Sequence, residues 1–174
     1  MKRILFILFL VGSGTIIFAQ NNSDSIVIRP LNNINVNVLG DASVISLNYE
    51  RLFLINPNIF ITGKIGIGYN EEFQLFSRGD ATPPSKYLTI PHHITANFGK
   101  SKHFLEAGLG GTFIHGNTSQ HYIPYPIVGY RLQPLKSNKL NFRVFVCFPF
   151  SGLDSKQTDD IIFSLLGLSL GICL

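Results

Sequence analysis

The sequence predicts an all-β protein, an eight-stranded antiparallel up-and-down transmembrane β-barrel. Three observations lead to this prediction. Hydrophobic residues make up 45% of the 174 residues and charged residues only 14%, against about 25% charged residues in typical soluble domains. No apolar run reaches the roughly 18 residues that a membrane-spanning helix needs. Most of the chain instead consists of short segments in which apolar and polar residues alternate, as they do in strands with two different faces.

The first 19 residues predict a secretory signal peptide, which leaves residues 20–174 as the barrel domain. Lys2 and Arg3 supply a positive start, residues 4–11 form an apolar run, and Ala19 is a small residue at the cleavage position. Removing Lys2 and Arg3 from the 14 basic residues leaves 12 against 10 acidic ones. So small a net charge argues against nucleic acid as a partner. We therefore expect an exported protein.

Eight alternating segments follow, separated by turn residues. They are Leu31–Leu39, Ser43–Phe53, Ile59–Tyr69, Tyr87–Phe98, His103–Ile114, Tyr122–Leu132, Leu140–Phe150 and Ile161–Cys173. A tilted membrane-spanning strand needs about 9–11 residues, and these segments are of that size. Their even number is the one expected for a single-chain antiparallel barrel of a bacterial outer membrane.

The composition of the two faces predicts which one lines the barrel. The polar faces are rich in Gly, Ser, Thr and Asn, which suits the narrow interior of an eight-stranded barrel. The apolar faces would then contact lipid, with aromatic girdles formed by residues near the segment ends. These residues are Tyr49, Phe53, Tyr69, Tyr87, Phe98 and Phe148. A soluble periplasmic barrel is the alternative. In it the apolar face of every strand would point inward and the polar face outward.

The lengths of the connections support the same topology. Residues 54–58, 99–102 and 133–139 form short links, whereas loops 70–86, 115–121 and 151–160 are longer and more polar. Short periplasmic turns and longer outer loops are typical of such barrels. The tight turn Gly40-Asp41-Ala42 is an exception. Loop 70–86 contains Arg78-Gly79-Asp80, a tripeptide known from adhesion motifs, which we interpret as a turn.

Several strings of the sequence resemble a known family. They are SLNYERLF (Ser46–Phe53), FGKSKHFLEAGLGGTF (Phe98–Phe113), VGYRLQP (Val128–Pro134), LNFRVFVCFPF (Leu140–Phe150) and the closing GLSLGICL (Gly167–Leu174). In this order and spacing they resemble small outer-membrane β-barrel proteins common in the Bacteroidetes, from about residue 30 to the end. The resemblance implies a fold and an outer-membrane location, and no particular activity.

Strand parity predicts a lumen charge cluster on the interior face. Its members are Glu50, Lys64, Glu106, Arg131 and Arg143. Two acids and three bases in a narrow interior are expected to pair, because an unpaired buried charge is costly. We therefore expect a closed lumen that is plugged by ion pairs. The alternative is a small-solute channel, in which the excess of one positive charge would mildly favour anions.

The sequence contains no clear set of catalytic residues. Some small outer-membrane barrels modify lipid A with a His, a Ser and an acid, and His93, Thr95 and Glu106 are a faint match. Thr replaces Ser, and no oxyanion-stabilising feature accompanies it. We expect no enzyme, and a lipid A-modifying enzyme remains the alternative.

Metal and disulfide sites are not expected either. His92 and His93 point to opposite faces of a strand, and His115 and His121 lack further ligands nearby. Cys147 and Cys173 share the inner face of neighbouring strands but lie too far apart along the sheet for a disulfide. No cofactor is predicted.

The sequence thus predicts a monomeric outer-membrane barrel with a structural or surface-interaction role. Its expected surroundings are outer-membrane lipids including lipopolysaccharide, and its expected contact regions are loops 70–86, 115–121 and 151–160.

Overall fold

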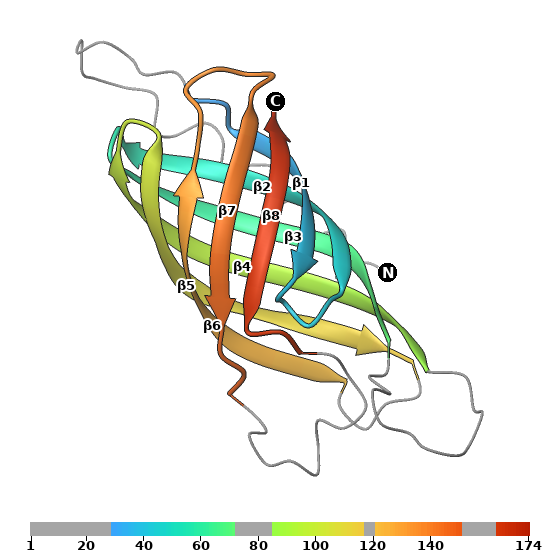
Figure 1. Ribbon diagram of the computed structural model, residues 1–174. Coiled ribbons are helices and arrows are strands. Elements are labelled where there is room, and N and C mark those ends of the chain that lie inside the picture. Colours follow the sequence, from blue (N-terminus) through green and yellow to red (C-terminus); the bar gives the residue numbers. More distant parts are fainter. Residues whose placement is uncertain (1–28, 72–84, 117–120, 151–162) are drawn as a thin grey trace, which may run out of the picture.

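Eight antiparallel strands close on themselves in the computed structural model, which describes residues 29–71, 85–116, 121–150 and 163–174 (Figure 1). The strands are β1 (Asn32–Leu39), β2 (Ile45–Asn56), β3 (Ile59–Glu71), β4 (Lys86–Lys100), β5 (His103–His115), β6 (Tyr122–Leu132), β7 (Leu140–Cys147) and β8 (Leu166–Cys173). Each strand pairs with its sequence neighbours, and β1 pairs with β8. The prediction of an all-β, closed, eight-stranded antiparallel barrel is confirmed. No described segment forms a helix long and apolar enough to cross a membrane.

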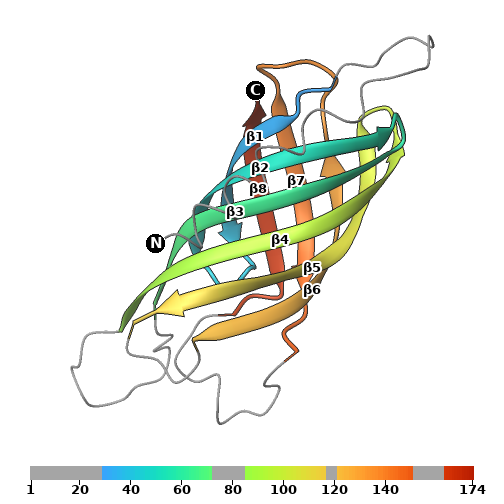
Figure 2. The same ribbon diagram turned by 180° about the vertical axis from the view of Figure 1, so that it is seen from behind.

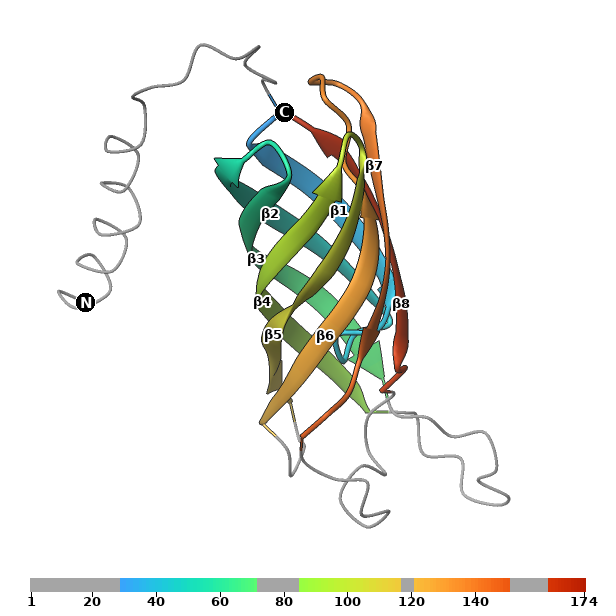
Figure 3. The same cartoon turned by 90° about the vertical axis from the view of Figure 1, so that its left-hand side faces the viewer.

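The pairing register carries each face continuously around the barrel. Ile34 of β1, for example, lies opposite Tyr49 of β2 on one side and Ile172 of β8 on the other. Since side chains in a strand alternate between faces, this register puts all three on the outside. The strands tilt strongly against the long axis of the barrel (Figures 2 and 3), as closure of a sheet requires.

The two ends of the barrel differ in their connections. The C-terminus and the start of β1 lie at the same end as the β2–β3, β4–β5 and β6–β7 connections (Figure 1), and we call it the terminal end. The β1–β2 turn lies at the opposite end. Leu174 donates its backbone N–H to the carbonyl of Asn32 at 2.8 Å, which ties the last residue to the first strand.

The polarity of the two faces is that expected from the alternation. The side chains that point into the barrel include 23 buried polar or charged residues of the described chain. The outward side chains are mostly large and apolar, and Ile67, Ile94 and Leu105 are 65–69% exposed. The barrel therefore has a polar interior and an apolar exterior.

One girdle residue was assigned wrongly. Tyr87 is 2% exposed and packs inside the barrel with Ile114 and Ile123. It follows Lys86 at the start of β4 and precedes the outward Leu88, so parity points its ring inward. The prediction took its position at a segment end as a sign of an outer girdle, but parity decides the face.

β7 is shorter than the predicted segment Leu140–Phe150. Beyond Cys147, Phe148 and Phe150 still donate their N–H groups to the carbonyls of Pro126 and Pro124 in β6, at 3.2 and 3.0 Å. The two prolines have no N–H to return on this side, so the regular ladder ends. β8 likewise begins at Leu166 rather than at Ile161.

Candidate functional site: the charged interior of the barrel

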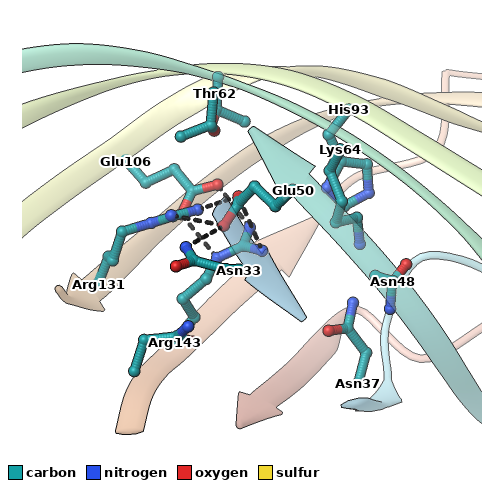
Figure 4. A network of polar contacts seen from close by, with 12 residues as sticks. Asn33, Asn37, Asn48, Glu50, Thr62, Lys64, His93, Glu106, Arg131 and Arg143 are labelled. Carbon is teal, nitrogen blue, oxygen red and sulfur yellow. Dashed lines mark hydrogen bonds and ion pairs between the residues drawn. The ribbon is translucent and has the colours of Figure 1, made fainter. Parts of the chain in front are cut away.

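The interior of the barrel is layered. Leu52, Phe60 and Phe104 form a small apolar cluster near the terminal end. A second apolar cluster includes Tyr125 and Phe145 nearer the opposite end. The lumen charge cluster lies between them, and Figure 4 shows its side chains converging from several strands. The layers fill the barrel with protein side chains.

Two arginines and two glutamates form the centre of the lumen charge cluster. Arg131 of β6 donates to both carboxylate oxygens of Glu50 of β2, at 2.8 and 2.5 Å. Arg143 of β7 holds Glu106 of β5 in the same two-bonded way, at 2.9 and 2.5 Å. A further bond of 3.3 Å from Arg131 Nε to Glu106 Oε2 joins the two pairs. Bidentate pairs of this kind are the strongest charge-assisted contacts of side chains.

All four of these side chains are excluded from solvent. Their side chains are at most 1% exposed. Asn33 of β1 adds a hydrogen bond of 3.0 Å to Glu50 Oε2. The cluster therefore connects β1, β2, β5, β6 and β7 across the barrel, and it joins strands that are not neighbours in the sheet.

Lys64 lies apart from the arginines and binds an acid that the sequence analysis missed. Its Nζ lies 2.9 Å from Asp41 Oδ2, and both side chains are buried. Asn37 donates to the same carboxylate oxygen at 2.7 Å. The carbonyl of Asp41 also accepts a bond of 2.6 Å from the Thr112 hydroxyl. Asp41 is thus fixed by β1, β3 and β5.

Asp41 reaches the interior because the β1–β2 turn folds inward. Leu39, Gly40, Asp41 and Ala42 have φ values of 61°, 67°, 40° and 53°, which is the left-handed region. At Gly40 a Cβ atom would lie 2.7 Å from the ring of Phe145 and 2.9 Å from the backbone of Gly167. Only glycine fits so close to the wall of the barrel. The turn thereby closes this end over Lys64.

Asp41 also corrects the predicted charge balance of the interior. The prediction had an excess of one positive charge, from Lys64, Arg131 and Arg143 against Glu50 and Glu106. With Asp41 the lumen charge cluster has three cations and three anions, each of them in an ion pair; Arg29 is a further buried cation at the terminal end. The electrostatic preference for anions that the prediction implied for a channel is therefore absent from this cluster.

Arg29 closes the terminal end. It is 3% exposed, and its guanidinium donates to the carbonyls of Gln133, Pro57 and Ser101, at 3.3, 3.3 and 2.5 Å. It also lies 4.7 Å from the centre of the Phe104 ring. Burial lowers the pKa of Arg29 from its ordinary value, but a guanidinium stays charged in proteins. The contacts tie the segment before β1 to three strand connections.

The residues of the possible lipid A-modifying site do not meet. The Nε2 atom of His93 lies 3.0 Å from the Tyr125 hydroxyl. The hydroxyl of Thr95 lies 2.6 Å from that of Thr62. The Glu106 carboxylate accepts hydrogen bonds from Arg131 and Arg143. Each candidate therefore has its own structural partner, and no nucleophile lies beside a base in this set.

The remaining candidates are placed as follows. His92 faces outward and stacks against Phe113 and Tyr122, whose rings also contact each other. Cys147 and Cys173 are both buried and free. Within the described part of the chain, no group of three or more His, Cys, Asp and Glu residues could hold a metal ion.

Several predicted features lie outside the described residues. They are the signal peptide 1–19, the tripeptide Arg78-Gly79-Asp80, loop 151–160 and most of loop 70–86. In loop 115–121, residues 117–120 also lie outside the described part.

The comparisons with known proteins add no relative. A scan against protein families, a search of curated proteins and a search of solved structures found no match to the chain.

Proposed function

We propose that the protein is a bacterial outer-membrane β-barrel with a closed lumen and a structural or surface-interaction role. The observation that supports this most is the inverted polarity of the barrel. A chain that folds in water buries large apolar side chains and exposes charges. Here seven charged side chains are buried inside, and the outer faces of all eight strands carry exposed Ile, Leu, Val, Phe and Tyr side chains. Lipid is the solvent in which that surface is stable.

The packed interior favours a closed barrel over a channel. A channel lumen needs space for water along its axis. In this barrel the fully buried side chains include Arg131, Arg143, Tyr125, Phe60 and Phe145, and the charged ones are bound to one another. Opening a path would require breaking buried ion pairs, each of which is costly to break.

The proposed location follows from the same reasoning and from the sequence. A signal peptide over residues 1–19 would export the chain, and the resemblance to small outer-membrane barrels of the Bacteroidetes points to the same compartment. The barrel would stand in lipid, including lipopolysaccharide, as a monomer. Loops 70–86, 115–121 and 151–160 would be available to partners at the cell surface.

Fractionation with a heat-modifiability assay tests the proposal. Outer membranes are isolated and solubilised in detergent, and the protein is run unboiled and boiled on a gel. We expect enrichment in the outer membrane and a mobility shift on boiling. Recovery as a soluble periplasmic protein without detergent would contradict the proposal. Conductance steps of the purified protein in planar bilayers would contradict the closed lumen.

A charge placed on the outer face separates lipid from water as its surroundings. Leu170 of β8 faces outward in the middle of its strand and is 53% exposed. In lipid, Leu170→Arg should destabilise the folded barrel by about 2–4 kcal/mol, whereas in water a surface change costs within about 0.5 kcal/mol. Ser137→Arg in the exposed β6–β7 turn is the control, and it should have little effect in either case.

A further inference from the structure

On the outer face of the described strands, Arg51 of β2 is the one Asp, Glu, Lys or Arg side chain away from a strand end. Outward positions in the described strands hold charged side chains only at strand ends, as at Glu71, Lys86 and Lys100, with Arg51 the exception. A guanidinium has five donors and stays charged in proteins. A cation on an otherwise apolar surface is costly unless an anion accompanies it. Its position therefore calls for an explanation.

The described residues provide Arg51 with few hydrogen-bond acceptors and no counter-charge. One guanidinium N–H donates to Asn32 Oδ1 at 2.7 Å, and that oxygen also accepts the Tyr49 hydroxyl at 2.7 Å. Arg51 takes part in no ion pair within the described residues. The contact with Asn32 fixes the side chain at the start of β1. Among the residues that the structure describes, the other guanidinium donors have no hydrogen-bond acceptor.

An apolar groove begins beside Arg51 and crosses β3, β4 and β5. It has a volume of about 1180 Å³. The floor contains Gly63, Ala96 and Ala107, which are small residues at outward positions of three successive strands. Ile94 and Leu109 stand at its sides, 69% and 61% exposed. The register places Gly63 next to both Arg51 and Ile94, so the groove leads directly from the cation.

We propose that this groove is a binding site for one phospholipid molecule, whose phosphate is held by Arg51 and whose acyl chain lies over Gly63. The proposal rests on the membrane location proposed above. Arginine binds phosphate oxygens through parallel N–H bonds, and an acyl chain matches the apolar lining. The cation and the groove are therefore explained by one ligand with an anionic head and an apolar tail.

The charges of the barrel favour a lipid over a second copy of the chain. No acidic side chain faces outward between the ends of the described strands. The apolar face of a second barrel would therefore bring no counter-charge to Arg51. A phospholipid brings a negative phosphate and a chain in the same molecule.

The structure offers a variant that fills the groove without disturbing the fold. A Cβ atom on Gly63 would have only one near neighbour, the Phe53 ring at 3.9 Å, which is ordinary van der Waals contact. Gly63→Leu should therefore fold and occupy the floor of the groove. Arg51→Gln removes the charge and keeps a polar side chain near Asn32. Val38→Leu on β1 and Lys86→Gln at the start of β4 are matched controls away from the groove.

The experiment is native mass spectrometry of the chain purified from outer membranes, released from detergent after titration with dipalmitoyl phosphatidylglycerol. Dipalmitoyl glycerol, which has the same chains without the phosphate, is the comparator. We expect one retained phosphatidylglycerol per barrel and about ten-fold weaker retention by Arg51→Gln, the effect of losing a charge-assisted contact. Retention by Gly63→Leu should fall by a similar factor, and both controls should match the unaltered chain. The comparator should bind about ten-fold more weakly.

Four results would overturn the inference. The first is equal retention by the chain, Arg51→Gln and Gly63→Leu. The second is equal binding of dipalmitoyl phosphatidylglycerol and dipalmitoyl glycerol, which would show that the site does not recognise the phosphate. The third is a mass of two chains that is lost in Gly63→Leu, which would assign the groove to a second copy. The fourth is retention of lipid A in place of the phospholipid.

The heat-modifiability of every variant is recorded in the same preparation. A protein recovered without detergent and without a mobility shift would contradict the proposed membrane location. A membrane barrel that binds no phospholipid in the groove would contradict only the lipid site.

Discussion

Replacing Glu106 by Gln should destabilise the folded barrel by about 3 kcal/mol, because breaking a buried ion pair by removing one partner costs about 3–5 kcal/mol. Gln keeps the shape of Glu106 and removes only its charge. In the structure, Glu106 accepts two bonds from Arg143 and one from Arg131. The change leaves Glu50 as the only acid beside two buried arginines. The lower end of the range applies because the amide oxygen can still accept one bond.

Urea unfolding in detergent, followed by the mobility of unboiled samples, measures this change by linear extrapolation. Lys136→Gln in the exposed β6–β7 turn removes one charge outside the barrel and should alter the free energy of unfolding by no more than about 0.5 kcal/mol. The double variant Glu106→Gln, Arg143→Met removes both members of the pair. It should recover about half of the loss, because no unpaired cation is left behind.

A loss below about 1 kcal/mol for Glu106→Gln would refute the reasoning. That is the size expected when water screens a pair of charges. The same result would indicate a wet interior and would count in favour of the channel. The single change Arg143→Met is measured alongside. If its loss and that of Glu106→Gln add up strictly to the loss of the double variant, the two residues do not stabilise one another.

Two further predictions concern the apolar layers and the thiols. Phe145→Ala should lower the free energy of unfolding by about 3–5 kcal/mol in the same urea assay, because the fully buried ring would leave a cavity; a loss below about 1 kcal/mol would mean that the interior collapses onto the site. Cys147 and Cys173 are buried and free, so both should react with a maleimide only after unfolding, and gel mobility should not depend on a reductant. Rapid labelling of the folded barrel would contradict this.

The sequence alone determined the strands and the faces of most of their residues. Alternation has a period of two, so it states for each residue of a strand whether it points in or out. Glu50 and Glu106 could be placed in the interior from their neighbours in the chain alone. Strand ends were less certain, because hydrogen bonding across the sheet decides them. The prolines of β6, for example, shorten β7.

Parity could not say which interior residues meet. Arg131 and Glu50 are 81 residues apart in the chain, and their contact depends on the closure of the sheet. Lys64 was expected to pair with the glutamates of the lumen charge cluster, but it binds Asp41. Asp41 belongs to a turn, where side chains do not alternate between two faces, so the sequence pattern could not place it. A Gly-Asp-Ala turn too short to leave the barrel was the one signal that could have pointed to it.

The tertiary structure alone also revealed the outer groove. Gly63, Ala96 and Ala107 are scattered in the sequence, and each is unremarkable in its own strand. Only the pairing register places Gly63 opposite Arg51 and Ala96 opposite Ala107, with Gly63 and Ala96 diagonal to each other across β3 and β4. Local periodicity thus determined the direction of each side chain, whereas the register and the closure of the barrel determined its neighbours, because those depend on contacts between distant strands.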